Sequence, residues 1–243
     1  MSEAQERPET QQRAERPASQ RCLFISTVRD NRLEREQVIG QLQAQGVDVT
    51  VHEWQSIEHF QYTFQQDAGY DLLYLSSHAD DTGFGENPWD NPWDEFATAV
   101  CVSDCMLPEA TLFLACCRGG MKTVALNLLS VCNKIDYIVG PEWKAKGADI
   151  SNAFRAYCEC CYTRKDGTKE PPCCIEKELT KAAGQTFACY DRVALECDLE
   201  IFRRLRSIDE QVYSNFRLLD AIKQQNEKIM EALGIFKVGE GKG

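Results

Sequence analysis

The stretch TLFLACCRGG, residues 111–120, joins an apolar run to two cysteines, an arginine and two glycines. Its apolar part has the composition of a buried strand, and Cys117 stands just past the end of that strand. A second stretch, DLLYLSSH at residues 71–78, has the same plan and ends in His78. Sites in open parallel sheets form at the carboxyl ends of strands. If these two strands are neighbours, His78 and Cys117 emerge at the same edge of the sheet.

Further strand-like and helix-like segments alternate on both sides of these two stretches. Apolar or alternating runs predict the other strands, at residues 22–28, 47–51 and 136–140. Helical spacing predicts helices at residues 33–45, 57–66, 93–100, 121–131, 150–162 and 175–183. Strands that alternate with helices indicate an α/β fold with a mostly parallel sheet and helices on both faces.

The two ends of the chain differ from this central part. Residues 1–20 are rich in Gln, Glu, Arg and Pro and contain no aromatic residue, so we expect a disordered tail. A long polar helix is expected at residues 209–233. We therefore predict one α/β domain at residues 21–205, followed at residues 206–243 by a C-terminal helix and tail that could contact a partner.

The composition narrows the classes of function. The chain has 243 residues, of which 43% are hydrophobic and 27% charged, as is usual for a soluble globular protein. Its net charge of −11 argues against nucleic-acid binding, which needs clustered Lys and Arg. No apolar run approaches the roughly 20 residues of a membrane-spanning helix, so no membrane partner is expected. The first residues lack the apolar core of a signal peptide, which predicts a cytoplasmic location and mostly free thiols among the 13 cysteines.

Neither a metal nor an organic cofactor is expected. Five cysteines that are close in the sequence form a possible zinc site, but they do not follow the usual pairing of zinc ligands, so free thiols are the favoured interpretation: Cys158, Cys160, Cys161, Cys173 and Cys174. The sequence also has no G-x-x-x-x-G-K-[ST] loop and, after its first strand, no G-x-G-x-x-G turn. A nucleotide-binding α/β protein is therefore disfavoured.

A cysteine that faces a histidine is a typical arrangement for nucleophilic catalysis. The imidazole of His78 would promote formation of the Cys117 thiolate and later protonate the leaving amine. The glycines after Cys117 allow a tight turn, in which a backbone N–H could stabilise an oxyanion. Cys116 is the alternative nucleophile, because a shift of one residue along a strand end changes which side chain faces the histidine.

Both stretches resemble segments of a known family. Residues 114–119, LACCRG, resemble the end of the nucleophile strand of the caspases, and residues 75–83, LSSHADDTG, are similar to the caspase histidine strand and loop. The sequence ACCRGG also resembles the bacterial caspase-like CHAT peptidases, in which a glycine, here Gly120, lies three residues after the nucleophile. The resemblance implies a clan CD cysteine peptidase with a caspase-like three-layer sandwich, in which His78 and Cys117 are the catalytic pair.

The resemblance covers roughly residues 22–190 and implies further roles. The backbone N–H groups of Ala79 and Cys117 would form the oxyanion hole. Ala79 stands where the family usually has Gly, and Ala115 stands where caspases have Gln, so cleavage after aspartate is not implied. A role in bacterial defence or cell death is implied by the resemblance alone.

Acidic residues near the expected site indicate a class of substrate. The resemblance places the primary specificity pocket after the strand at residues 136–140, where Glu142 and Asp149 lie. A carboxylate there would favour cleavage after Arg or Lys, and Asp80, close to His78, could also attract a basic substrate. The alternative is that Asp149 caps a helix and that Glu142 and Asp80 are solvated loop residues.

The sequence therefore predicts a cysteine endopeptidase that acts on a protein substrate. Regulation is expected from a partner chain or from processing in the basic loop at residues 163–169. In the C-terminal helix, steps of three and four residues predict either packing on its own domain or a coiled coil with a regulatory partner, through Leu219, Ile222, Asn226, Ile229 and Leu233. The alternative function is a catalytically silent caspase-like interaction module, which would use this helix and the repeated Asn-Pro-Trp-Asp sequence at residues 87–94.

Overall fold

The computed structural model describes residues 20–28, 32–64, 69–162 and 171–232 of the chain. The predicted N-terminal tail, the basic loop at 163–169 and Leu233 lie outside the described residues. The chain divides into two compact units, with the boundary between Asp191 and Arg192.

The first unit is built on one six-stranded sheet with the strand order β2-β1-β3-β4-β5-β6. Strands β1 to β5 run parallel and β6 is antiparallel to β5. The strands are β1 (Arg21–Ser26), β2 (Asp48–Glu53), β3 (Tyr70–Ser76), β4 (Met106–Ala115), β5 (Ile135–Pro141) and β6 (Phe187–Asp191). The mostly parallel sheet predicted from the sequence is confirmed, while β6 is a strand that the sequence pattern did not indicate.

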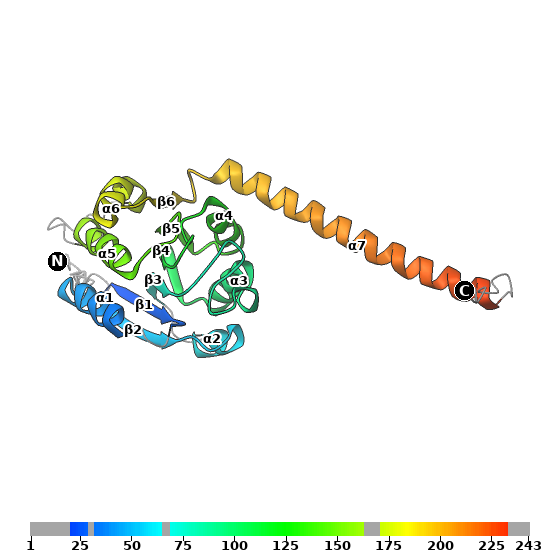
Figure 1. The fold of residues 1–243 in the computed structure, drawn as a ribbon, viewed down its shortest axis with the longest axis horizontal. Helices are drawn as coiled ribbons and strands as arrows, with labels where there is room; N and C mark the ends of the chain where they lie inside the picture. The colour runs from blue at the N-terminus through cyan, green and yellow to red at the C-terminus, as the bar shows by residue number, and fades with distance from the viewer. Residues whose placement is uncertain (1–19, 29–31, 65–68, 163–170, 233–243) are drawn as a thin grey trace, which may run out of the picture. The chain divides into compact units, whose positions relative to one another are not determined.

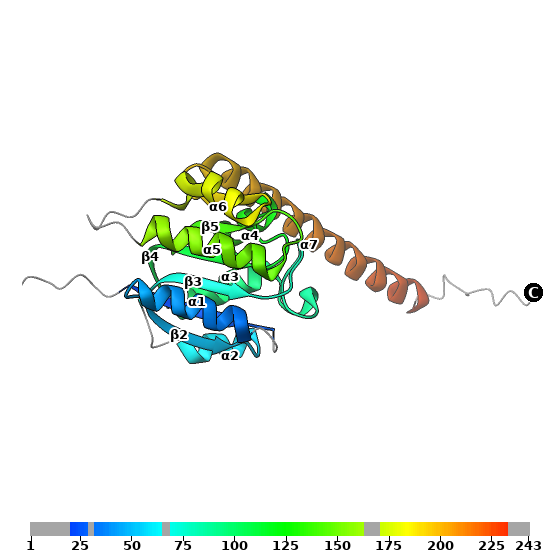
Figure 2. The same ribbon diagram turned by 60° about the vertical axis from the view of Figure 1, so that its left-hand side comes forward.

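Helices cover both faces of this sheet. Figure 1 shows α1, α5 and α6 on one face and α2, α3 and α4 on the other, and Figure 2 shows the same layers from the side. Their bounds are α1 (Arg32–Ala44), α2 (Ile57–Phe64), α3 (Trp93–Ser103), α4 (Lys122–Val131), α5 (Gly147–Cys161) and α6 (Glu176–Ala183), with short 3₁₀ turns η1 (Pro88–Asp90) and η2 (Pro172–Ile175). The three-layer α/β arrangement agrees with the predicted fold class.

The central strands β3 and β4 are held by apolar contacts on both of their faces. On the face covered by α5, the ring of Tyr74 stacks between Phe24 and Phe113, with centroid distances of 5.1 and 5.3 Å. Phe154 of α5 packs edge-on against Tyr74 and Phe113, at 4.7 and 4.9 Å. Nearly every residue of β3 is buried, as expected for a parallel strand covered on both sides. The ends of β3 and β4 are therefore fixed by a well-packed core.

The described part of the second unit is one helix, α7 (Glu196–Ala232), which is 37 residues long. It begins at Glu196, earlier than the predicted start at residue 209. No helix among the described residues has both the length and the apolar composition needed to cross a bilayer.

Candidate active site

The register of β3 and β4 places the two predicted catalytic segments side by side. Ser76 pairs with Ala115, and the backbone N–H of Ser77 donates a hydrogen bond to the carbonyl of Ala115 at 3.4 Å. His78 and Cys117 each follow this pair by two residues. The two segments therefore leave the sheet from adjacent strands, at the same edge and at the same level.

The two neighbouring cysteines at the end of β4 lie in different environments. The Cys116 side chain is only 1% exposed, whereas Cys117 is half-buried. Burial raises the pKa of the Cys116 thiol, and the charges of Cys117 and Glu34 raise it further. The Cys117 Sγ lies 4.0 Å from the carbonyl oxygen of Ala145, to which it can donate. Of the two thiols, Cys117 is the one that meets solvent.

The turn that carries Cys117 passes very close to the end of β5. A Cβ atom on Gly120 would overlap the carbonyl group of Gly140, and a Cβ on Gly140 would lie 2.8 Å from backbone atoms of Gly119 and Gly120. The Gly120 N–H donates to the carbonyl of Pro141 at 2.9 Å. Glycine is therefore required on both sides of this crossing, and the crossing fixes the position of the turn.

Arg118, directly after Cys117, has an unusual backbone conformation. Its φ of 61° lies in the left-handed region, which is rare for a residue other than glycine. Its N–H donates to the carbonyl of Trp143 at 3.2 Å, and its guanidinium forms an ion pair with Asp81 at 3.5 Å. Asp81 belongs to the loop after His78. The two segments at the candidate site are thus connected by a side-chain contact as well as by the sheet.

The loop after β3 is held by hydrogen bonds while the His78 side chain is exposed. Gly85 donates its N–H to the carbonyl of His78 at 2.8 Å and also to the Ser77 hydroxyl at 2.9 Å. The Trp93 indole Nε1 donates to the carbonyl of Asp80 at 2.9 Å. In the repeated Asn-Pro-Trp-Asp sequence, Trp93 is thus buried in local packing, whereas Trp89 is 74% exposed.

The backbone N–H groups that follow the ends of β3 and β4 include two without an acceptor among the described residues. Within the described part of the chain, neither the N–H of Ala79 nor that of Cys117 donates a hydrogen bond. Ala79 is not among the three non-glycine residues with positive φ that the described segments contain. An alanine at this position therefore fits without backbone strain.

The three acidic residues predicted for substrate binding have different surroundings. The Asp80 carboxylate accepts hydrogen bonds from the Thr82 N–H and hydroxyl, at 2.7 and 2.6 Å, and from the Gly83 N–H at 3.2 Å. Burial alone would raise the pKa of Asp80, but these hydrogen bonds and the charge of Arg118 lower it overall. Asp80 therefore stabilises its own loop.

Asp149 and Glu142 lie after β5 and differ from each other. The Asp149 carboxylate accepts from the Lys146 N–H at 3.3 Å and from the Gln185 side-chain amide at 3.2 Å, so it caps the start of α5. The Glu142 side chain is half-buried, and its carboxylate accepts no hydrogen bond from any described residue. Burial, followed by the charge of Glu142, raises the pKa of Tyr190 to about 12. Of the predicted pocket acids, only Glu142 has a carboxylate that is not already bound within the described segments.

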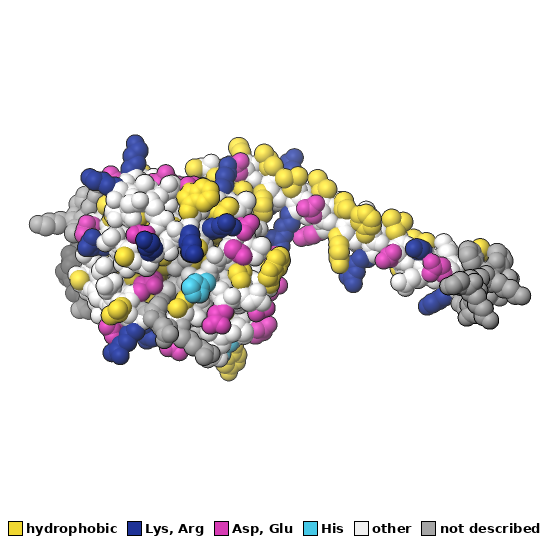
Figure 3. Space-filling view, in the orientation of Figure 1, with side chains coloured by type: hydrophobic (Ala, Val, Ile, Leu, Met, Phe, Trp, Pro, Cys, Tyr) yellow, Lys and Arg dark blue, Asp and Glu magenta, His cyan; other side chains and the backbone are white. Residues whose placement is uncertain are grey.

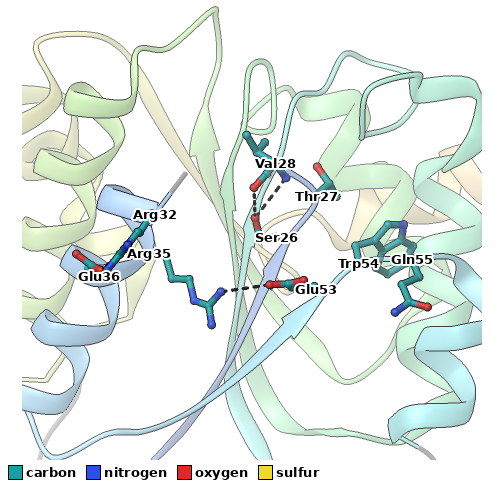
Figure 4. A pocket seen from close by; sticks show the side chains of 9 residues that line it. All are labelled: Ser26, Thr27, Val28, Arg32, Arg35, Glu36, Glu53, Trp54 and Gln55. Carbon is teal, nitrogen blue, oxygen red and sulfur yellow. Dashed lines mark hydrogen bonds and ion pairs between the residues drawn. The ribbon is translucent and has the colours of Figure 1, made fainter. Parts of the chain in front are cut away.

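Two hollows lie at the carboxyl ends of β1 and β2, and the sequence did not predict either. The larger has a volume of about 830 Å³ and contains the ion pair between Arg35 and Glu53 (Figure 4). It is lined by Ser26, Thr27, Val28, Arg32, Arg35, Glu36, Glu53, Trp54 and Gln55. The smaller, of about 450 Å³, adjoins the loop after His78 and includes four carboxylates, from Glu58, Glu86, Asp90 and Glu95. Both hollows open on polar side chains at the same edge of the sheet as the candidate site.

The cysteines considered as zinc ligands are dispersed in the structure. Cys158 and Cys161 are buried in the core, whereas Cys173 and Cys174 are exposed. Within the described ranges, no group of three or more His, Cys, Asp or Glu side chains is arranged to hold a metal ion.

Comparison with known proteins gives similarity at the level of the fold. No protein-family model matches the sequence, and no curated protein matches it. A crystal structure described as the Arg-specific cysteine proteinase gingipain R (RgpB) matches 70% of this chain with a TM-score of 0.51 and 11% sequence identity. A complex of the pro- and mature domains of RgpB from Porphyromonas gingivalis matches 71% of this chain with a TM-score of 0.45 and 11% identity.

The chain spans less than half of the structures that it matches, covering 46% and 47% of them. At this level of identity the similarity to gingipain R is a similarity of fold. The first unit therefore has the caspase-like α/β fold that the sequence predicted, and that fold occurs in a cysteine proteinase.

Proposed function

We propose that this chain is a cysteine endopeptidase that cleaves a protein substrate with His78 and Cys117. The observation that carries the proposal is the register of β3 with β4, which brings the segments of a histidine and a half-buried cysteine to one edge of the sheet. Ligands of open parallel sheets bind at this edge. The similarity in fold to a cysteine proteinase supports the same class of reaction.

In the proposed mechanism, His78 accepts the proton of the Cys117 thiol, and the thiolate attacks the carbonyl carbon of the scissile peptide bond. The negative charge that develops on the carbonyl oxygen is stabilised by the free N–H groups of Ala79 and Cys117. The C–N bond then breaks, and His78 gives its proton to the leaving amine. Water hydrolyses the resulting thioester and regenerates the thiol.

Cys117 is a better nucleophile than Cys116 for two reasons. Cys116 is fully buried and its pKa is raised, so its thiolate is disfavoured and out of reach of a substrate. Cys117 is half-buried, and its turn is fixed by the crossing of Gly120 with Gly140. The alternative assignment to Cys116 is therefore the weaker one.

The proposed substrate has a basic residue at P1. Glu142 supports this preference, because its carboxylate follows β5 and accepts no hydrogen bond from the described residues. The gingipain R structure is described as Arg-specific, which agrees with the same preference. Regulation by a partner chain or by processing is proposed on the family resemblance. A cytoplasmic location is proposed because all 13 cysteines are free.

The first test measures the cleavage of a library of peptide substrates by three variants of the purified protein. Cys117→Ala is expected to lose cleavage, and His78→Ala to lose about 10²- to 10⁴-fold, because each removes one member of the pair. Cys116→Ala is the matched control and is expected to keep its activity, because its thiol faces the core. Circular dichroism checks that all three variants are folded. Unchanged cleavage by Cys117→Ala, or its loss only in Cys116→Ala, contradicts the assignment.

The second candidate function is a catalytically silent interaction module, which the exposed apolar side chains of α7 favour. An alkylating peptide probe distinguishes the two. Fast labelling confined to Cys117 supports the peptidase, whereas slow labelling of all exposed thiols alike, among them Cys173, Cys174 and Cys197, supports the module.

A further inference from the structure

Helix α7 exposes an unusual amount of apolar surface. Ten large apolar side chains between Ile201 and Ile229 are 44–66% exposed, and Figure 3 shows apolar side chains following the length of the helix. Most helices in proteins are stabilised by packing an apolar face against other elements. The described part of the second unit contains no other element on which this face could pack. A continuous apolar surface of this kind marks an interaction site.

These side chains follow a heptad repeat that is longer than the sequence pattern first indicated. Steps of four and three residues alternate without a break over four heptads, and we call these positions the seam: Ile201, Leu205, Ile208, Val212, Asn215, Leu219, Ile222, Asn226 and Ile229. All of them lie within one continuous helix. An uninterrupted repeat of this length is typical of a coiled coil.

The two asparagines in the seam indicate what covers it. A buried amide must find a hydrogen-bond partner, so the partner helix needs polar groups opposite both Asn215 and Asn226. A second copy of α7, parallel and in register, places each asparagine opposite its equivalent. An antiparallel copy that pairs Asn215 with Asn226 leaves three seam positions, Ile201, Leu205 and Ile208, without a facing residue in the described helix, which covers Glu196–Ala232. The parallel arrangement covers every seam position.

Charges beside the seam agree with the same arrangement. In a parallel coiled coil the residue before position a faces, in the neighbouring helix, the residue that follows position d of the same heptad, five residues further along. Arg204 then faces Asp209 of the second copy, which is an attractive pair. Arg204 already pairs with Glu200 of its own helix at 2.7 Å, so its guanidinium is held near this flank. None of the remaining flanking pairs joins like charges, since Gln211, Leu218 and Gln225 face Phe216, Lys223 and Met230.

The residue types in the seam also bear on the number of strands. Leucine at two of the four a positions, Leu205 and Leu219, together with isoleucine at four of the five d positions, favours three or four strands over two. The flanking positions include apolar residues, Phe216 and Leu218 among them, which are 66% and 60% exposed. They widen the apolar stripe beyond what two helices would cover.

We propose that copies of this chain assemble through the seam of α7 into a parallel, in-register coiled coil of three or four strands. This proposal is based on α7 alone and does not depend on the peptidase activity. A parallel bundle brings the N-terminal ends of all its helices together, so the first units of the assembled copies are attached at the same end.

Sedimentation equilibrium of the full chain tests the assembly. Each chain has a mass of 27.6 kDa, and three or four times this mass is expected at micromolar concentration. The seam variant Val212→Asp/Leu219→Asp is expected to be monomeric, because it places charges in two apolar layers. The matched control is Tyr213→Asp, which changes the residue next to Val212 on another face of the helix, and it is expected to keep the assembly. Circular dichroism checks that the first unit of each variant stays folded.

Three outcomes would overturn the proposal. A monomeric wild-type chain refutes the assembly, and a dimer refutes the number of strands. Equal loss of assembly in Tyr213→Asp and in the seam variant refutes the seam as the contact surface.

Charge reversal tests the parallel register. Asp209→Arg places like charges opposite each other and is expected to weaken assembly roughly tenfold. The triple change Glu200→Arg/Arg204→Glu/Asp209→Arg restores opposite charges between helices and keeps the pair within the helix, so it is expected to restore assembly. Failure of the triple change to restore it, with the helix content unchanged, contradicts the parallel register.

Discussion

At the scale of single residues, Gly120 has little space around it. The carbonyl of Gly140 occupies the volume that a side chain on Gly120 would need, and the backbone there is held by the hydrogen bond to Pro141. We expect Gly120→Ala to lower the free energy of unfolding by about 1–3 kcal/mol, because neither the backbone at Gly120 nor that at Gly140 can move without disturbing β5. Cleavage is expected to fall as well, because the turn that carries Cys117 must shift.

Urea denaturation measures this effect, with Gly40→Ala as its control. Gly40 lies within α1, and no atom comes within 4 Å of the place that an alanine methyl group would take there. Alanine at this position is therefore expected to stabilise the protein by about 0.5–1 kcal/mol. Equal stability of Gly120→Ala and the wild type would show that the crossing relaxes to accept a methyl group.

Glu142 provides the residue-scale test of the basic P1 preference. Glu142→Gln removes the charge and keeps the size of the side chain, so kcat/KM for substrates with Arg at P1 is expected to fall by about 10- to 100-fold. Substrates with an uncharged P1 residue should be affected little. Asp149→Asn is the comparison, because that carboxylate is already bound by Lys146 and Gln185. A cleavage profile dominated by Asp or by apolar residues at P1 excludes the preference.

At the scale of elements, β2 and α2 pack through two histidines. His52 is 7% exposed, and its ring stacks on that of His59 at a centroid distance of 5.3 Å, with Phe64 edge-on at 5.0 Å. Among the described residues, the His52 Nε2 and the His59 Nδ1 are buried without a hydrogen-bond partner. Burial, followed by the charge of His59, lowers the pKa of His52 below its ordinary value, although Glu53 opposes this shift. His52 therefore takes up a proton less readily in the folded protein than in the unfolded chain.

This contact makes stability depend on pH in a defined direction. The unfolded chain takes up a proton near pH 6.5 while the folded chain does so only at lower pH, so the unfolded state binds more protons below pH 6.5. The stabilisation is complete above this pH and is lost as the pH falls toward the pKa of folded His52. We expect the free energy of unfolding to decrease by up to about 1.4 kcal/mol per pH unit from this group.

Urea denaturation between about pH 7.5 and pH 5 measures the pH dependence, because this range brackets the ordinary histidine pKa. His52→Phe is the matched variant, because a phenyl ring fits among Phe60 and Phe64 and does not titrate. Its stability should fall less steeply as the pH decreases. The same slope in both proteins would show that another group is responsible.

At the scale of the whole molecule, the sequence predicted the layers better than the contacts between them. Continuous apolar runs at residues 71–77 and 111–115 indicated buried parallel strands, because such runs depend only on local burial. Strand β6 (Phe187–Asp191) was missed, since its pairing with β5 joins residues about 50 positions apart. The start of α7 at Glu196 was also missed, because its first heptads contain more charged residues than the region from Leu219 onward.

For the candidate site, too, the sequence indicated where the elements lie better than it indicated the contacts between them. The placement of the two strand ends followed from fold class, and the register of Ser76 with Ala115 agrees with it. The difference between Cys116 and Cys117 could not be read from the sequence, because it depends on how the turn after β4 packs against residues distant in the chain. The crossing of Gly120 with Gly140 and the two hollows after β1 and β2 arise from residues distant in the chain, and no local pattern reports them.

The 13 cysteines offer a way to follow how this molecule opens. Seven are buried, and they are distributed over strands β1 and β6, helix α5 and the connecting segments: Cys22, Cys105, Cys116, Cys132, Cys158, Cys161 and Cys189. A buried thiol reacts only when its surroundings unfold locally, and different regions open with different free energies. The order in which these thiols react with an alkylating reagent therefore reports the order of local opening events within the first unit, from fraying edges to the central strands. No label has to be introduced into the protein.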